Sequence, residues 1–352
     1  MGGLLIAWLA GAGLVAAPSA NTPSIRFEYE RIEMAVSFKF VFYAPNEDTA
    51  NRAAESAYQR LHQLNAILSD YDPESELRRL CDTAGEGKTV NVSDDLWRVL
   101  TAALSMASRS DGAFDPTIGP LVRVWRLARR FEKMPPQSLL DQMRALVDYR
   151  LVRLVPEKHG VELTKKGMRL DFGGIAKGYA VEEVLVVLRK YGVTRAMVHA
   201  GGDIGLGDPP PGELGWTVGI GAREPKGPPS FYLRLSHAFV ANSGDMWQYV
   251  VLNGKRYSHI VDPRTGLGLT DRSSVTVVGP DGMTTDAISK VVSVLGPEKG
   301  LTIIDNTPGV AAYVVRSAEN GKLEVRQSSR WKDLPVVKEI RPGGTQPAKA
   351  ER

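Results

Sequence analysis

A carboxylate and a lysine stand four residues apart in the segment 284–290, which reads TTDAISK. On a helix, Asp286 and Lys290 would face the same way and could form an ordinary surface ion pair, worth about 0.2–0.5 kcal/mol. The alternative is that Asp286, a carboxylate at a helix start, binds a metal ion. The segment by itself leaves both interpretations open.

A second segment, 170–180 (LDFGGIAKGYA), joins a predicted strand to a predicted helix through Gly173 and Gly174. Backbone without side chains lets a ligand approach closely, and a helix N-terminus offers free N–H groups to an anion. Lys177 falls in the first helical turn, where a positive charge opposes the helix dipole. Such a lysine is expected to have an anionic partner, which would be a bound phosphate or Asp171.

Two further segments combine polar residues with turns. In 257–266 (YSHIVDPRTG), a strand that carries His259 runs into an Asp-Pro turn, and 110–121 (SDGAFDPTIGPL) follows a helix that Gly112 can end. A lone strand histidine is usually structural, and the nearby turn raises the odds of a functional role only modestly. Taken alone, 110–121 is a helix cap and a turn. Each of the four segments is a weak signal by itself.

Hydrophobic periodicity predicts the elements that position these segments. In 34–43, apolar residues alternate at period two, which predicts a strand. Apolar residues at helical spacing predict helices over 48–68, from Ser93 onward, over 175–191 and over 285–295. Ser93 followed by two aspartates is a good helix start. Gly192 is expected to end the third helix, and Gly296-Pro297 the fourth.

The remaining apolar runs are short and typical of strands. They cover 161–164, 169–172, 196–199, 216–220, 231–235, 238–241, 249–252, 256–261, 274–278 and 310–315. Asn253-Gly254 between two of them predicts a two-residue hairpin. Because strands outnumber helices and do not alternate with them regularly, the pattern favours an α+β fold over a doubly wound sheet.

Composition excludes several classes of protein. The chain has 352 residues, of which 43% are hydrophobic and 24% charged, so global disorder is excluded. Its single cysteine, Cys81, excludes a disulfide scaffold and a cysteine-rich metal site. A net charge of +4 from 44 basic and 40 acidic residues gives no reason to expect a nucleic-acid partner. The five histidines are scattered, so any metal site is expected to be oxygen-rich, as Mg²⁺ or Ca²⁺ prefers.

The N-terminal residues 3–20 are apolar and then small, as in a secretory signal segment. An uncleaved membrane anchor is the alternative, although the run is short for a span. Residues 11–16 match the dinucleotide fingerprint G-x-G-x-x-A, but no strand precedes them and no helix follows, so a Rossmann fold is disfavoured. The stretches 208–212 and 224–229 are expected to be rigid surface loops, and 341–352 a disordered tail.

Six longer motifs carry a resemblance to a known family. They are LSDYDPESELRRL (68–80), DGAFDPTIGPLVRVW (111–125), LDFGGIAKGYAVE (170–182), HAGGDIG (199–205), SHIVDPRTG (258–266) and TDAISKVVSVLG (285–296). In this order they resemble the ApbE family of FAD:protein FMN transferases, formerly called thiamine-biosynthesis lipoproteins. The resemblance implies an α+β, T-fold-related unit of two lobes with mostly antiparallel sheets. It also implies an enzyme that cleaves FAD, attaches FMN through its phosphate to a Thr or Ser of an acceptor protein, and releases AMP.

The same resemblance implies a set of site residues. The FAD pocket would involve Met34, Tyr71, Ala113, Phe114, Asp115, Asp171, Lys177 and His259. Mg²⁺ would be held by the backbone carbonyl of Gly174, by Asp286, and by a Thr four residues after it. Tyr71 would offer a ring for stacking on flavin or adenine. His259 would take the proton of the acceptor hydroxyl or hold a phosphate as imidazolium, and the sequence does not separate these roles.

The chain departs from the family pattern where Lys290 replaces the usual Thr, because a protonated lysine cannot ligate Mg²⁺. Either Lys290 points away, or its ammonium stands in for part of the metal's charge. The strand start also reads Met34-Ala-Val-Ser instead of Met-Gly-Thr. Two alternatives to the transferase therefore stay open: a non-catalytic exported FAD-binding protein, and a metal-dependent FAD pyrophosphatase that uses water.

The resemblance and the N-terminus together suggest where the protein works. The expected organisation is a signal peptide or anchor over 1–20, one catalytic domain over 25–335, and the tail. The expected location is the periplasm, or the inner membrane facing the periplasm if the N-terminus stays attached. The expected partner, besides FAD, is an exported flavin-carrying subunit of a respiratory or redox complex.

Overall fold

The computed structural model describes residues 24–221, 229–244, 248–317 and 323–337. The predicted signal segment 1–20, the fingerprint match at 11–16, residues 224–228 of the second predicted loop, and the tail 341–352 lie outside the described residues.

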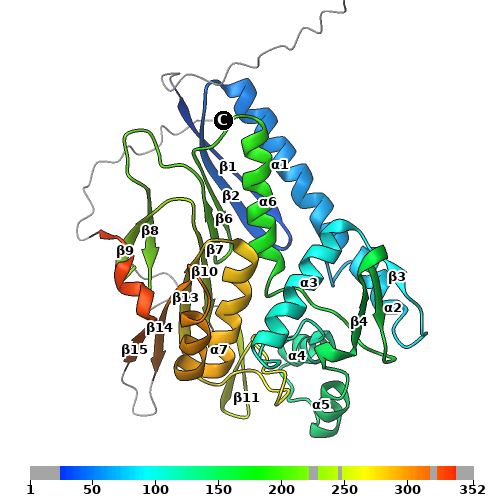
Figure 1. Ribbon diagram of the computed structural model, residues 1–352. Helices are drawn as coiled ribbons and strands as arrows, with labels where there is room; N and C mark the ends of the chain where they lie inside the picture. The colour runs from blue at the N-terminus through cyan, green and yellow to red at the C-terminus, as the bar shows by residue number, and fades with distance from the viewer. Residues whose placement is uncertain (1–23, 222–228, 245–247, 318–322, 338–352) are drawn as a thin grey trace, which may run out of the picture.

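An antiparallel sheet of eight strands forms the centre of the molecule (Figure 1). In spatial order its strands are β1 (Ile25–Glu33), β2 (Val36–Ala44), β6 (Ala196–Ala200), β7 (Asp203–Leu206), β10 (Phe239–Gly244), β13 (Ser273–Gly279), β14 (Ala311–Ser317) and β15 (Leu323–Gln327). Each strand pairs antiparallel with its neighbours. Sequence-distant segments therefore meet at the sheet, as the α+β prediction requires.

Alternating residues of the sheet bury two separate faces. On β2, Phe38, Phe40 and Phe42 are fully buried in the main core, and the Phe40 ring stacks on Tyr58 with centroids 4.5 Å apart. This face is covered by α1 (Glu47–Leu68), α6 (Ala176–Lys190) and α7 (Gly282–Asp305). Val41 points the other way, into a second core under a small sheet of β8 (Trp216–Ile220), β9 (Phe231–Leu235) and β16 (Val336–Val337). The period of two thus explains both layers.

A second, mostly helical lobe lies beside α1 and α7 (Figure 1). It holds α2 (Glu76–Asp82), α3 (Asp94–Arg109), α4 (Gly119–Phe131), α5 (Gln137–Arg144) and a sheet of β3 (Val90–Asn91), β5 (Gly160–Leu163) and β4 (Val152–Val155). The hairpin of β11 (Tyr249–Leu252) and β12 (Lys255–Ser258) packs on α4, where Trp125 Nε1 donates to the Gly266 carbonyl at 2.8 Å. That contact fixes the turn after His259 against α4.

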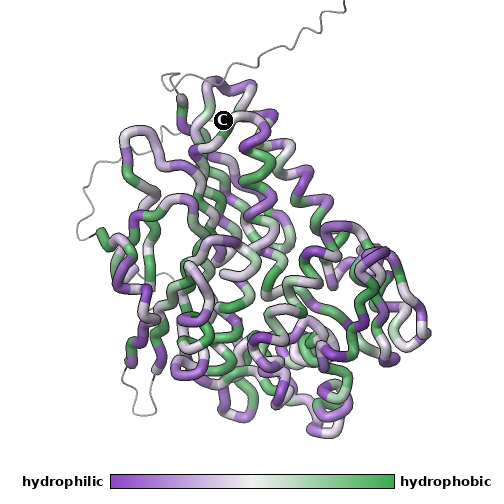
Figure 2. Tube along the Cα trace, in the orientation of Figure 1, coloured by the Kyte–Doolittle hydropathy of each residue, from purple (hydrophilic) through white to green (hydrophobic). Residues whose placement is uncertain are grey.

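Several local predictions are confirmed. The Ser93 side chain caps α3 by accepting from the Leu96 N–H, and Gly192 follows α6 with φ of 75°. Asn253 and Gly254 both have positive φ in the predicted hairpin turn. Figure 2 shows hydrophilic and hydrophobic residues alternating along α1, in keeping with one buried face. Within the described ranges, no helix has the length and apolar character needed to cross a membrane.

Other predictions are wrong in detail. Residues 169–172 form no strand, because Arg169 makes only an isolated bridge with Ile118 and the Asp171 N–H bonds to the Pro116 carbonyl. The predicted strand 256–261 ends at Ser258. The last helix begins at Gly282, capped by Asp281, before the expected start at 285. Its expected end is confirmed, because Gly296 has a non-helical backbone with φ of 77° and ψ of 173°, and a further helical segment of α7 follows it. Met34 and Ala35 form the β1–β2 turn with positive φ, so the strand starts at Val36.

Candidate functional site

The N-terminal turns of α6 and α7 approach each other through two glycines. A Cβ added to Gly178 would overlap the Gly282 carbonyl oxygen, and a Cβ on Gly282 would overlap the Gly178 carbonyl oxygen. Glycine is therefore required at both positions for this close contact. It lets the Gly178 N–H reach the side chain of Asp286, whose Oδ2 accepts at 3.1 Å.

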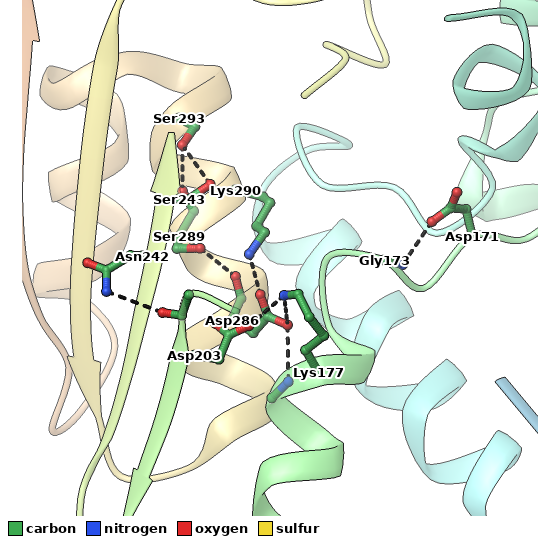
Figure 3. A network of polar contacts seen from close by, with 12 residues as sticks. Asp171, Gly173, Lys177, Asp203, Asn242, Ser243, Asp286, Ser289, Lys290 and Ser293 are labelled. Atoms are coloured by element: carbon green, nitrogen blue, oxygen red, sulfur yellow. Dashed lines mark hydrogen bonds and ion pairs between the residues drawn. The ribbon is translucent and has the colours of Figure 1, made fainter. Parts of the chain in front are cut away.

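Four charged side chains meet beside this contact, and we call them the α6–α7 charge cluster: Lys177, Asp203, Asp286 and Lys290 (Figure 3). Lys177 Nζ lies 2.5 Å from Asp203 Oδ2 and 3.7 Å from Asp286 Oδ2. The Lys290 ammonium contacts Asp286 Oδ1. The Asp286 side chain has no exposed surface, and that of Lys290 is 17% exposed. The pair is therefore not a surface ion pair.

The neighbouring charges decide how the cluster titrates. Burial alone would raise the pKa of Asp286, but the ammonium groups of Lys177 and Lys290 hold its pKa below the usual value. Burial opposes the charge of Lys177, yet Asp203 and Asp286 raise the pKa of its ammonium. Asp286 and Lys177 are thus charged in the pH range where proteins are handled.

Gly174 and Phe114 form the wall next to Lys290. A Cβ on Gly174 would lie 3.1 Å from the Phe114 ring and 3.5 Å from Lys290 Cγ. The aliphatic stem of Lys290 therefore runs past the Gly174 backbone while its ammonium reaches Asp286. The groups expected to surround a metal ion are close together, and the Lys290 ammonium is among them.

His259 lies near the same cations. Burial, together with the charges of Lys290, Arg129 and Lys177, lowers its pKa to about 4. Its Nδ1 lies 3.1 Å from the Gln248 carbonyl oxygen. A carbonyl can only accept, so Nδ1 carries the proton and Nε2 of the neutral ring keeps a free lone pair. The residue is set up as a proton acceptor.

A second group, which we call the Tyr71 cluster, consists of Asp70, Tyr71, Arg126 and Asp171. The Arg126 guanidinium lies 3.9 Å from the centre of the Tyr71 ring, and the ring is 70% exposed. Arg126 also contacts Asp70 and bonds to Asp171 Oδ2 at 3.0 Å. Burial and the charge of Asp70 together raise the pKa of Asp171 to about 6, against the charge of Arg126. One guanidinium thus serves two carboxylates and one ring.

The comparisons with known proteins agree with this fold. The sequence model of the ApbE family matches residues 32–314. This chain belongs to the ApbE family. It is 31% identical to the FAD:protein FMN transferase of Treponema pallidum over 89% of this chain and 90% of that protein. It is 30% identical to the protein of the same name from Haemophilus influenzae, over 83% of this chain and 86% of that one.

Solved structures of ApbE proteins share the fold. The flavinyl transferase ApbE from Pseudomonas stutzeri, in its apo form, aligns with a TM-score of 0.78 at 26% identity, over 88% of this chain and 97% of that one. The flavin transferase ApbE from Vibrio cholerae aligns with a TM-score of 0.80 at 24% identity, over 89% of this chain and all of that one. The predicted fold class is therefore confirmed.

The structure of this ApbE-family chain brings some of the expected site residues together and separates others. Gly174, Lys177 and Asp286 lie close together. His259 lies near enough for the charge of Lys177 to lower its pKa. Tyr71 and Asp171 belong to the other cluster. Of the two partners considered for Lys177, a bound phosphate and Asp171, the second is wrong, because Asp171 bonds to Gly173 and Arg126 and turns away from Lys177 (Figure 3).

The 110–121 segment of this ApbE-family chain packs against the Gly174 backbone through Phe114. Ala113 and Phe114 are buried, and Phe114 touches the Gly174 wall. Both oxygens of Asp115 are used within the fold: Oδ1 accepts from the N–H and the hydroxyl of Thr117, and Oδ2 accepts from the Tyr149 N–H at 2.9 Å. Asp115 therefore holds the loop in shape. Met34 sits in the β1–β2 turn and is partly buried against the main core.

Sequence reasoning missed Asp203 and the arginines of α4. Asp203 lies at the start of β7 inside the motif 199–205, so its only sequence signal was an acid after two glycines. Arg126 and Arg129 gave no signal, because arginines in a helix are usually solvated. Each becomes visible only through its neighbours in space.

Proposed function

We propose that this protein transfers FMN from FAD to a Thr or Ser hydroxyl of an acceptor protein and releases AMP. Membership of the ApbE family and the names of the Treponema pallidum and Haemophilus influenzae relatives support the proposal. The observation that carries it is the placement of buried ammonium groups beside a neutral histidine with a free Nε2. Phosphoryl-type transfer needs this combination of positive charge and proton acceptor.

The reaction assigns a separate task to each group. The acceptor hydroxyl oxygen forms a bond to the phosphorus on the FMN side of the pyrophosphate, and the bond from that phosphorus to the bridging oxygen breaks. The hydroxyl proton passes to Nε2 of His259 and then to solvent, and the bridging oxygen leaves with AMP. The ammonium groups of Lys177 and Lys290 offset the charge that grows on the phosphate oxygens.

The flavin-binding groups are proposed on geometry and resemblance together. One face of the Tyr71 ring is covered by Arg126, and its large exposed fraction leaves the other face for a flat ligand ring. The Ala113-Phe114 wall and the Met34 turn would line the pocket. Asp171 belongs to the Tyr71 cluster and Lys177 to the α6–α7 charge cluster, so the two would meet different parts of FAD.

The expected Mg²⁺ would be held by Asp286 and the Gly174 carbonyl, but the side chains present do not fit it. Both Asp286 oxygens are engaged, one by the Lys290 ammonium and the other by the Gly178 N–H. The described residues contain no group of three or more His, Cys, Asp or Glu side chains placed to hold a metal ion. Mg²⁺ requires about six oxygen ligands in near-octahedral geometry.

A single incubation tests the proposed activity against its alternatives. The purified protein is mixed with FAD and an acceptor domain that carries a target Thr or Ser, with and without Mg²⁺, and the products are resolved by gel fluorescence and chromatography. Covalent flavin on the acceptor supports the transferase. FMN and AMP free in solution would show a pyrophosphatase. Intact bound FAD without turnover would show a binding protein.

Location and acceptor remain proposals from the sequence. We propose export to the periplasm through the N-terminal segment 1–20, with attachment to the inner membrane if that segment is not cleaved. The acceptor would then be an exported flavin-carrying subunit of a respiratory or redox complex. Fractionation of cells that express the full chain tests the location, and a periplasmic fraction with the N-terminus removed is the expected result.

A further inference from the structure

Lys290 occupies the position where a metal ion would meet Asp286. Its ammonium contacts Asp286 Oδ1, and its stem lies along Gly174, the residue whose carbonyl would be the other protein ligand. A cation that approached Asp286 from this side would have to displace the ammonium. The first of the two sequence hypotheses, that Lys290 points away from Asp286, is therefore wrong.

The charge cluster is balanced as it stands. It contains two ammonium groups, Lys177 and Lys290, and two carboxylates, Asp203 and Asp286. A divalent cation would add two positive charges with no further carboxylate to offset them, and uncompensated charge in a buried site is costly. With a neutral hydroxyl at position 290, the same cluster would carry one net negative charge and would attract such an ion.

One open oxygen remains in the cluster. Asp203 Oδ1 is buried and has no hydrogen-bond partner among the described residues. A single free carboxylate oxygen falls well short of the oxygen set that Mg²⁺ requires.

We propose that the Lys290 ammonium replaces the divalent metal ion at this site, so that the chain binds no divalent cation at Asp286 and transfers FMN without one. The proposal rests on the proposed function for its catalytic half, and its binding half stands without it. The ammonium would place one positive charge near the phosphate oxygens and donate N–H hydrogen bonds to them. A divalent metal ion would instead bring two charges and bind the oxygens directly.

The binding half is tested on the nucleotide-free protein by titration with Mn²⁺, followed by electron paramagnetic resonance and calorimetry. The wild type is expected to show no saturable site, and Lys290→Thr is expected to gain one. Lys299→Thr is the matched control, because it makes the same change at an exposed position on the same helix and should bind no Mn²⁺. Lys290→Arg keeps the positive charge and should also bind none, so the test does not depend on one variant folding well.

The catalytic half is tested by the rate of flavin transfer in EDTA and in excess Mg²⁺. The wild type should differ by less than about twofold between the two, and Lys290→Thr should depend on Mg²⁺ by about tenfold or more, the effect of one strong interaction. Saturable Mn²⁺ binding by the wild type that Lys290→Thr leaves unchanged would overturn the proposal, as would loss of wild-type transfer in EDTA. If no transfer occurs under any condition, the proposed function fails, and the Mn²⁺ titration still decides the binding half.

Discussion

Asp171 and Asp286 are both buried carboxylates that accept a hydrogen bond from the segment leading into α6, yet their pKa values shift in opposite directions. Asp171 accepts from the Gly173 N–H and has its pKa raised to about 6, mainly by burial. Asp286 accepts from the Gly178 N–H and has its pKa lowered in spite of burial. Burial alone therefore does not explain why the pKa values of the two carboxylates shift in opposite directions.

The difference lies in the ratio of cations to carboxylates. Asp286 has Lys177 and Lys290 beside it, and Asp203 is the other acid in that cluster. Asp171 shares the single guanidinium of Arg126 with Asp70. Two cations for two acids keep Asp286 ionised, although burial and the charge of Asp286 raise the pKa of Asp203. One cation for two acids leaves Asp171 of the Tyr71 cluster close to taking up a proton. The first region suits fixed charge stabilisation, and the second suits an exposed binding surface.

Asp286→Asn should have the largest effect. It leaves Lys290 without a charged partner and puts two ammonium groups against the one carboxylate of Asp203, so the free energy of unfolding should fall by about 3–5 kcal/mol near neutral pH. Flavin transfer should be lost. Urea unfolding and the transfer assay measure both effects.

Glu298→Ala is the control for Asp286→Asn, because Glu298 is exposed on the same helix and its loss should change stability by less than about 0.5 kcal/mol. If the two variants were equally stable, then the ion pairs of Asp286 would not stabilise the protein, and the contrast with Asp171 would fail.

His259→Gln should lower the transfer rate by about 10²–10⁴-fold, the usual contribution of a general base. Burial first and the nearby cations second keep this histidine neutral, so the wild-type rate should stay level as the pH falls from 7 to 5 and drop only near the pKa of about 4. An imidazolium that holds phosphate would instead lose activity as the pH rises above its ordinary pKa. A pH profile of the transfer rate separates the two, and a decline that begins between pH 7 and 6 would refute the base role.

Much of the fold follows from local sequence patterns. The alternation at Phe38, Phe40 and Phe42, the Ser93 cap and the Asn253-Gly254 turn are each local, and each is confirmed. The prediction of a strand over 169–172 is wrong because the apolar residues there are buried but have no neighbouring strand to pair with. Burial can be seen in the chemical type of a residue, but a pairing partner cannot.

The site was predictable in its members more than in its contacts. Residues next to a helix start, such as Gly174, Lys177 and Asp286, stand out in the sequence. Which of them touch depends on the approach of α6 to α7, and the Gly178–Gly282 contact that permits it spans over a hundred residues of chain. The sequence therefore offers a bound phosphate or Asp171 as the partner of Lys177, whereas in space the partner is Asp203.

Arg126→Met removes the one cation that, among the described residues, Asp70 and Asp171 share, and it should destabilise the protein by about 1–3 kcal/mol at pH 8. The two carboxylates would then repel each other, and the pKa of Asp171 would rise above its present value of about 6. A carboxyl group with a raised native pKa destabilises the native state above that pKa, so the loss should shrink as the pH is lowered to 5. Urea unfolding at the two pH values checks this, and a loss that grows at low pH would contradict it.

Asp171→Asn should have the smallest effect and the opposite sign to Asp286→Asn. The native pKa of Asp171, about 6, lies above the value of about 3.9 in an unfolded chain, so the charged carboxylate costs native stability at pH 8. An amide keeps an oxygen for the Gly173 N–H and leaves Arg126 paired with Asp70, so the variant should gain about 1 kcal/mol at pH 8. The gain should fade as the pH falls through 6 towards about 3, below both pKa values, where the wild-type carboxyl is protonated in both states. Stability curves of the two Asn variants over this pH range test the comparison directly: if both lose stability at pH 8, then the balance of cations and acids is not what separates the two carboxylates.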